Sequence, residues 1–154
     1  MTGVQTCALP ILTAFRGLVD AVGDGLAAAG YPAVRATHGF AMQAIGSGCT
    51  SVELGQRLGV TKQAATKTAA TLEDLGFITR VPSPTDGRER LLVPTQRGQQ
   101  MLSLSASLFT QQIQQWRARV GDDSVDATLD TLSQADPGHR GPNGHLRLGL
   151  IDVP

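Results

Sequence analysis

The segment 50–98 constrains the fold most, because its helix caps and turns follow one another at short spacings. Thr50 and Glu53 form a Thr-x-x-Glu capping box, in which each side chain bonds the other residue's backbone N–H. This box predicts a short helix over 51–58. After a Gly-Val turn, Thr61 has the N-cap position of a second helix that runs to about residue 75. Two short helices in tandem, joined by a tight turn, are therefore expected.

A β-hairpin is predicted directly after the second helix. Gly76 can adopt the left-handed conformation that ends a helix, and short strands rich in apolar and β-branched residues follow at 77–81 and 89–93. Between them, Pro82, Pro84 and Gly87 mark a hairpin tip. The order of helix, turn, helix and hairpin predicts a winged helix-turn-helix over 46–98.

Amphipathic helices are expected on both sides of this unit. A helical stripe begins at Ile11 and ends near Ala29, where Gly30-Tyr31-Pro32 stops the helix and the proline is well placed to open the next one. The next helix has Val34, His38, Ala41 and Ile45 on one stripe. Thr95 caps a long helix with a seam through Met101, Leu104, Leu108, Phe109, Ile113, Trp116 and Val120, and a last helix starts at Asp122 with Val125, Leu129 and Leu132 on one face.

The small winged-helix core cannot cover all of these apolar stripes. Such stripes most often bury against a second copy of the same chain, so residues 12–29 and 96–134 are predicted to be dimerisation helices. A two-fold dimer would place its two second helices roughly 34–36 Å apart, which is one turn of DNA. The predicted fold is mainly α with a small β-hairpin wing, in one domain over 12–134.

The two ends of the sequence are treated separately. The first eleven residues, MTGVQTCALPI, resemble the in-frame translation of a sequencing-library adapter, and we interpret them as a non-native leader. Residues 135–154 are rich in glycine and proline at their start and are predicted to form a flexible tail.

Composition excludes several classes of function. The formal net charge is +0, so an attraction to nucleic acid must be local; residues 47–97 carry seven Lys or Arg against five Asp or Glu. Two cysteines make neither a metal cluster nor a disulfide framework, and they favour a reducing cytoplasm. No membrane span, secretory signal, nucleophile elbow or phosphate-binding glycine loop is present, so neither an enzyme nor a bound cofactor or metal is expected.

The second short helix has a polar face suited to a DNA major groove. Gln63 can offer a bidentate amide to adenine, and Thr66 can donate to a base or a phosphate. Lys62 and Lys67 are expected on phosphates, and Thr61 starts the same helix. The opposite face, formed by Ala65, Ala69 and Leu72, is predicted to be buried, which favours DNA contact over a merely solvated helix.

The hairpin tip carries arginines. Arg88 is expected to enter the minor groove, and Arg90 at i+2 would project from the same side of a strand. The alternative is a winged helix that binds a protein partner and not DNA, which the neutral net charge and low lysine content favour slightly.

The segment TSVELGQRLGVTKQAATKTAATLEDLGFITRVPSPTDGRERLLVPTQRG resembles the MarR family of bacterial transcription regulators. The resemblance implies a homodimer that binds a pseudo-palindromic double-stranded operator, usually as a repressor. It also implies release by a small aromatic effector or an oxidant. By this resemblance the DNA contacts of the reading helix fall on Thr61, Gln63, Thr66 and Lys67. Arg88 is by the same resemblance the wing arginine of the minor groove, and Asp86 orients it.

Two further groups of residues could respond to a small effector or to an oxidant. Tyr31, His38, Phe40 and Met42 are expected to line an effector pocket between the dimerisation helices and the winged helix, although a satisfied core histidine is the commoner role for His38. Cys49 could sense peroxide, but a small semi-buried filler is the favoured interpretation, because no second plausible native cysteine is available to resolve a sulfenic acid.

Overall fold

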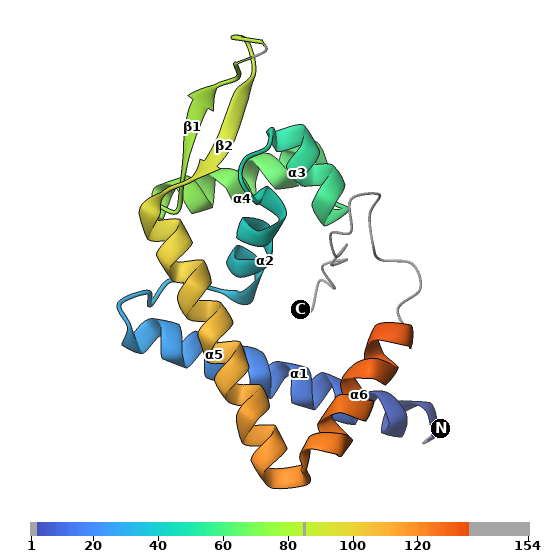
Figure 1. Ribbon diagram of the computed structural model, residues 1–154. Coiled ribbons are helices and arrows are strands. Elements are labelled where there is room, and N and C mark those ends of the chain that lie inside the picture. The colour runs from blue at the N-terminus through green and yellow to red at the C-terminus, as the bar shows by residue number, and fades with distance from the viewer. Residues whose placement is uncertain (1–2, 85, 136–154) are drawn as a thin grey trace.

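The computed structural model describes residues 3–84 and 86–135, with side chains described from Leu9 to Gln134 except at position 85. Within these ranges the elements are α1 (Gly3–Ala28), α2 (Ala36–Ile45), α3 (Ser51–Leu58), α4 (Lys62–Asp74), β1 (Ile78–Pro82), β2 (Arg90–Pro94), α5 (Gln96–Val120) and α6 (Asp122–Ala135) (Figure 1). The predicted fold class, mainly helical with a hairpin wing, is confirmed. The predicted tail lies outside the described residues except for Ala135.

The winged helix has a single core beneath α3, α4 and the hairpin. Its largest fully buried side chains include Met42 of α2, Leu54 of α3, Leu72 of α4 and Phe77 before β1. The hairpin is extended at its base, because Cys49 pairs with Leu92 through two backbone hydrogen bonds of 3.2 and 2.7 Å. The loop between α2 and α3 is thereby attached to β2, which fixes the wing relative to the helices.

The caps predicted from the sequence are present. Thr50 and Glu53 form both bonds of the capping box, at 2.7 and 3.2 Å, and the side chains of Thr61 and Thr95 each accept an N–H in the first turn of their helices. Gly76 has φ +74°, the left-handed conformation expected at the end of α4. These caps are local interactions, so their spacing in the sequence was sufficient to predict them.

Two helix starts differ from the prediction. Helix α1 begins at Gly3 rather than near Ile11 and contains Pro10, so it includes residues that were set aside as a leader. Helix α2 begins at Ala36, and Pro32 does not open it. Instead, the N–H of Val34 donates to the carbonyl of Tyr31 at 3.3 Å, so Pro32 occupies a turn in which its fixed φ is also favourable.

Both strands lie one residue later than predicted. The pairing runs from Ile78 opposite Pro94 to Pro82 opposite Arg90. Phe77 precedes the ladder because its N–H closes the end of α4 by donating to the carbonyl of Leu72 at 2.9 Å.

The remaining helices form a second layer below the winged helix (Figure 1). Helix α5 descends from the hairpin and crosses α1 near Gly25, whose missing side chain leaves room for Leu108. Helix α6 turns back beside α1, and Arg117 fastens the α5–α6 corner through ion pairs with Asp122 and Asp126. No helix of the described part is long and apolar enough to cross a membrane.

Candidate nucleic-acid interface

Helix α4 shows one face to the core and the opposite face to solvent. Ala65, Ala69 and Leu72 are each 0% exposed, as predicted. This burial against the rest of the winged helix leaves four polar side chains of its first turns exposed: Lys62, Gln63, Thr66 and Lys67. The first turns of a helix are the part that a helix-turn-helix protein inserts into a major groove.

One hydrogen bond on this face differs from the predicted role of Thr66. The hydroxyl of Thr66 donates to the carbonyl of Lys62 at 2.8 Å, so its proton is used within the helix and is not free for a base or phosphate. The side chains of Gln63, Lys62 and Lys67 have no hydrogen bond or ion pair with any described residue. Their amide and ammonium groups are therefore available to a ligand.

The wing tip is shaped by short-range hydrogen bonds around Asp86. Its carboxylate accepts the backbone N–H of Arg88 at 2.9 Å, and its own N–H donates to the hydroxyl of Ser83 at 3.4 Å. The N–H of Ser83 in turn donates to the carbonyl of Glu89 at 3.0 Å. Asp86 thus holds the backbone that carries Arg88, rather than its guanidinium.

Arg88 and Arg90 are both exposed, but they do not share a strand. Arg88 lies in the turn and Arg90 is the first residue of β2, so the predicted i+2 relationship on one strand face does not apply. The wing projects beyond α3 and α4 (Figure 1), which places these cations beyond the rest of the molecule.

Two other basic residues near this surface already have partners. The guanidinium of Arg80 is 2.8 Å from the carboxylate of Glu73. Arg97 lies over the aromatic rings of Tyr31 and Phe77, at 4.8 and 5.7 Å from their centroids. These contacts stabilise the base of the wing. Among the described residues of the interface, the side chains of Lys62, Lys67, Arg88 and Arg90 have neither an ion pair nor an aromatic contact.

Arg57 is a positioning residue that the sequence analysis did not identify. Its guanidinium donates to the carbonyls of Ala44 and Ile45, at 2.7 and 3.3 Å, and so caps the end of α2 from α3. A basic residue in the last turn of α3 gave no local signal, because its acceptors are twelve and thirteen residues away. The contact fixes α3, and with it α4, on the rest of the fold.

Cys49 is buried, with 1% of its surface exposed, in agreement with the favoured interpretation of a core filler. Burial raises the pKa of its thiol to about 11, although the nearby Arg57 acts in the opposite direction. A thiol with this pKa is almost entirely protonated near neutral pH, and the protonated form is a poor nucleophile.

The four residues predicted to line an effector pocket do not surround one cavity. Met42 is completely buried in the core, and Tyr31 packs on Phe77 with ring centroids 6.1 Å apart. His38 faces a groove beside α4, and its Nδ1 accepts the N–H of Arg35 at 3.2 Å. Desolvation and then Arg35 lower the pKa of His38, so its neutral form is favoured.

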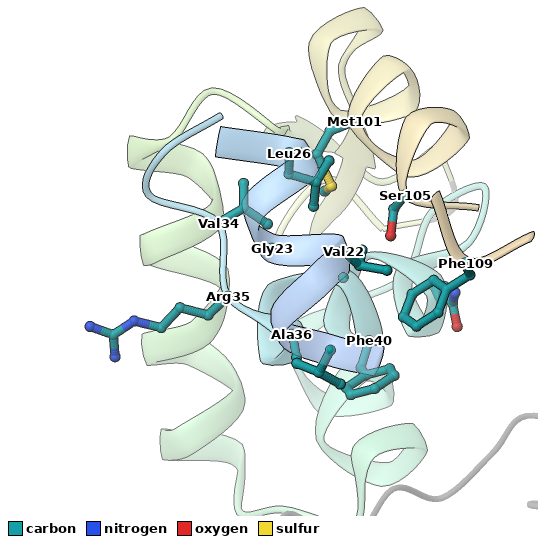
Figure 2. Close-up of a pocket in the computed structure, with 13 residues that line it drawn as sticks. Val22, Gly23, Leu26, Val34, Arg35, Ala36, Phe40, Met101, Ser105 and Phe109 are labelled. Atoms are coloured by element: carbon teal, nitrogen blue, oxygen red, sulfur yellow. The ribbon is translucent and has the colours of Figure 1, made fainter. Parts of the chain in front are cut away.

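Only Phe40 of those four residues lines the cavity that lies between α1, α2 and α5 (Figure 2). This cavity encloses about 30 Å³, and its walls are mostly apolar, with Val22, Met101 and Phe109 among them. Ser105 supplies a polar group, whereas the guanidinium of Arg35 points away from the cavity in Figure 2. Spacing within α2 could not identify the cavity, because most of its wall comes from other helices.

The geometry of capped helices, buried α4 face and exposed wing is accompanied by a sequence match. The model of the MarR family matches residues 40–89, which run from α2 to the wing tip. The winged helix is thus similar to that of the MarR family. This confirms the resemblance found in the sequence, on the same helices and the same Asp-x-Arg turn.

Solved structures of MarR-type proteins share the fold beyond the matched segment. A variant of MarR from E. coli, complexed with operator DNA, has 22% identity and a TM-score of 0.65, covering 85% of this chain and 93% of that one. FabT from Streptococcus pneumoniae, in complex with DNA, has 17% identity and a TM-score of 0.73, covering 86% and 94%. The transcriptional repressor CouR, bound to a 23-mer DNA duplex, has 19% identity and a TM-score of 0.67, covering 84% and 91%. No curated protein matches the sequence.

Proposed function

We propose that this MarR-type chain is a cytoplasmic, non-enzymatic transcriptional regulator that binds DNA sequence-specifically. The observation that carries the proposal is the combination of an exposed polar face on α4 with an exposed arginine turn on the wing beside it. Helix α4 has the dimensions to enter a major groove, and Arg88 on the wing can enter the neighbouring minor groove.

The cations of this surface have two roles. Lys62 and Lys67 flank the reading face of α4 and would neutralise phosphates, which positions the protein without selecting a sequence. Gln63 and Thr66 lie on the same exposed turns and would face the base edges. The DNA complexes of FabT, of MarR from E. coli and of CouR support DNA binding by likeness of fold.

We propose that the protein acts as a homodimer. Large apolar side chains remain exposed on α1, at the end of α5 and on α6: Leu9, Ile11, Leu12, Phe15, Val120, Leu129 and Leu132. The helices that carry them lie in the lower layer in Figure 1, away from the wing. A soluble monomer rarely exposes so many large apolar groups together, and a second copy would cover them.

We further propose that DNA binding represses transcription and that a small apolar or aromatic effector releases it. The cavity of Figure 2 has walls from α1 and α5, which belong to the lower layer, and from α2, which belongs to the winged helix. An aromatic molecule is larger than the present cavity, so it would push these helices apart and change the angle between the two wings of a dimer. Ligand-dependent loss of DNA binding would support this step.

A salt titration with the DNA directly upstream of the gene tests the function. We expect a competitor-resistant complex whose affinity falls steeply with salt, and Arg88→Ala should weaken it and reduce the salt slope by about one phosphate contact. Arg35→Ala is the matched control, because Arg35 is equally exposed but belongs to the α1–α2 loop, away from the wing. Absence of any complex at low salt would overturn the proposal and favour a winged helix that binds a protein partner.

A further inference from the structure

The exposed side chains of α4 differ in what they can read from a base pair. We infer that the preferred operator half-sites are A·T-rich, both under α4 and in the minor groove under the wing. This inference rests on the proposed DNA binding and adds to it the class of sequence that the protein selects.

Two of the groups that read G·C pairs, an arginine and a carboxylate, are missing from the exposed first turns of α4. Guanine is most often read by arginine or lysine, and cytosine by a carboxylate that accepts from its amino group. Helix α4, which is described over its whole length, contains no arginine. Its two carboxylates, Glu73 and Asp74, lie in the last turn, and Glu73 is already paired with Arg80.

Gln63 has the side chain that can recognise adenine. It is exposed in the first turn of α4 and has no partner among the described residues, so both ends of its amide are free. The amide oxygen can accept from N6 of adenine while the amide nitrogen donates to N7. Adenine is the only base that carries both a donor and an acceptor at its own major-groove edge.

Thr66 has a methyl group that can contact thymine. Because its hydroxyl proton is donated to the carbonyl of Lys62, the outward chemistry of this side chain is a methyl group and the lone pairs of an oxygen. The C5-methyl group of thymine is the apolar feature of the major groove that a side-chain methyl contacts. Ala64 and Ala70, which are exposed on the same helix, also offer only methyl groups.

The lysines do not offset this preference. A lysine ammonium is a compact charge on a flexible stem, and it lacks the rigid fork with which arginine selects guanine. Lys62 and Lys67 are therefore assigned to the phosphates on either side of the groove.

The wing favours the same base pairs by shape. Arg88 is exposed on a turn whose backbone is held by Asp86, so its guanidinium is available to the minor groove. A·T tracts have a narrow minor groove with an enhanced negative potential, which attracts an inserted arginine. Both contact regions thus select A·T pairs, one by chemistry and the other by groove width.

Selection of bound duplexes from a random-sequence pool tests the inference directly. With the full chain as bait, we expect enriched half-sites with A·T pairs at the major-groove positions and in the flanking minor groove. Replacement of a contacted thymine by uracil removes only the methyl group, and replacement of a contacted adenine by 7-deazaadenine removes only N7. Each change should weaken binding by about fivefold or more.

Matched variants connect these base changes to residues. Gln63→Ala should abolish the penalty of 7-deazaadenine, whereas Gln100→Ala, an exposed glutamine on α5, should leave it intact. Thr66→Ser, which loses the methyl group, should abolish the penalty of uracil. Thr66→Val, which keeps a methyl group and loses the hydroxyl, should retain it.

The outcomes separate the inference from the function on which it rests. Enrichment of G·C pairs under α4, or base analogues without effect in the selected duplex, would overturn the inference while DNA binding stands. If no sequence is enriched and no salt-dependent complex forms, the proposed function fails, and the inference fails with it.

Discussion

The carboxylate of Asp86 accepts the backbone N–H of Arg88 at 2.9 Å, so an acidic residue holds in place the arginine proposed to contact DNA. The negative charge of Asp86 weakens DNA binding, because it lies at the same wing tip as Arg88 and repels the phosphates. The two effects of Asp86, on backbone geometry and on charge, can be separated by substitution.

Asp86→Asn keeps an acceptor oxygen and removes the charge, whereas Asp86→Ala removes both. We expect Asp86→Asn to bind DNA at least as tightly as the wild type, and Asp86→Ala to bind about fivefold more weakly than Asp86→Asn, since one hydrogen bond contributes about 1 kcal/mol. Fluorescence anisotropy with a labelled operator measures both. Equal affinities of the two variants would show that the hydrogen bond does not position Arg88.

The buried thiol of Cys49 should be inert in the folded protein. Its pKa of about 11 lies above the ordinary value of 9.0, so the thiolate population near pH 8 is roughly a hundredfold below that of an exposed cysteine. In a Cys7→Ser background we expect very slow labelling by a thiol reagent at pH 8, and rapid labelling in urea.

The same shift predicts a loss of stability in alkali. The folded protein keeps the Cys49 proton while the unfolded chain loses it, so the free energy of unfolding should fall as the pH rises from 9 towards 11. Cys49→Ala should show a smaller fall over this range.

Fast labelling of Cys49 in the native protein, or loss of DNA binding on mild peroxide treatment, would contradict the assignment of Cys49 as a core filler.

The capping box of α3 should make stability depend on acid pH. The pKa of Glu53 lies below its ordinary value of 4.5, chiefly because its carboxylate accepts the N–H of Thr50. A lowered pKa means that the contribution is present above pH 4.5 and is lost as the pH falls through the folded-state value.

Glu53→Gln tests this, because glutamine keeps the acceptor and cannot titrate. In urea unfolding between pH 6 and pH 3, the stability difference between wild type and Glu53→Gln should shrink as the pH falls. A constant difference over this range would show that the carboxylate charge does not stabilise α3.

The apolar face of α6 should control the oligomeric state. Leu129 and Leu132 are 39% and 43% exposed in the single chain, and replacing both by glutamate should yield a monomer at concentrations at which the wild type is a dimer. Sedimentation velocity measures the state. Val52→Glu is the matched control, since Val52 is 45% exposed but lies on α3, outside this face.

A monomer would hold only one half-site. We therefore expect the α6 double variant to lose about a hundredfold or more in operator affinity, because the second half-site no longer binds at high effective concentration. An unchanged dimer would place the self-association surface elsewhere.

Local signals in the sequence were sufficient for the order of the elements and for most of their ends. The caps at Thr50, Thr61 and Thr95 and the stop at Gly76 each involve residues at most three or four positions apart, so their spacing carries the information. The polar and buried faces of α4 followed from helical periodicity for the same reason. At Pro32 the preference of proline for the first position of a helix predicted the wrong start, because α2 begins at Ala36.

Contacts between distant residues were decided only by the tertiary structure. Gly98 ends the segment that resembles the MarR family, but the sequence does not show why this residue must be small. In the fold, a Cβ at this position would overlap the carbonyl oxygen of Phe77 and lie 2.7 Å from the Cε of Met42. Helix α5 can pack against the start of the wing only because that atom is missing.

Three other features also depend on contacts between residues that are distant in the sequence. They are the cap of Arg57 on α2, the bridge between Cys49 and Leu92, and the cavity between α1, α2 and α5. Each joins residues more than ten positions apart, and their separation in the sequence says nothing of their distance in space. The sequence by itself therefore determined which helices and strands form and which face of α4 is polar. Close packing of those elements decided how the wing, the reading helix and the cavity are placed relative to one another, because it depends on side chains that meet only after folding.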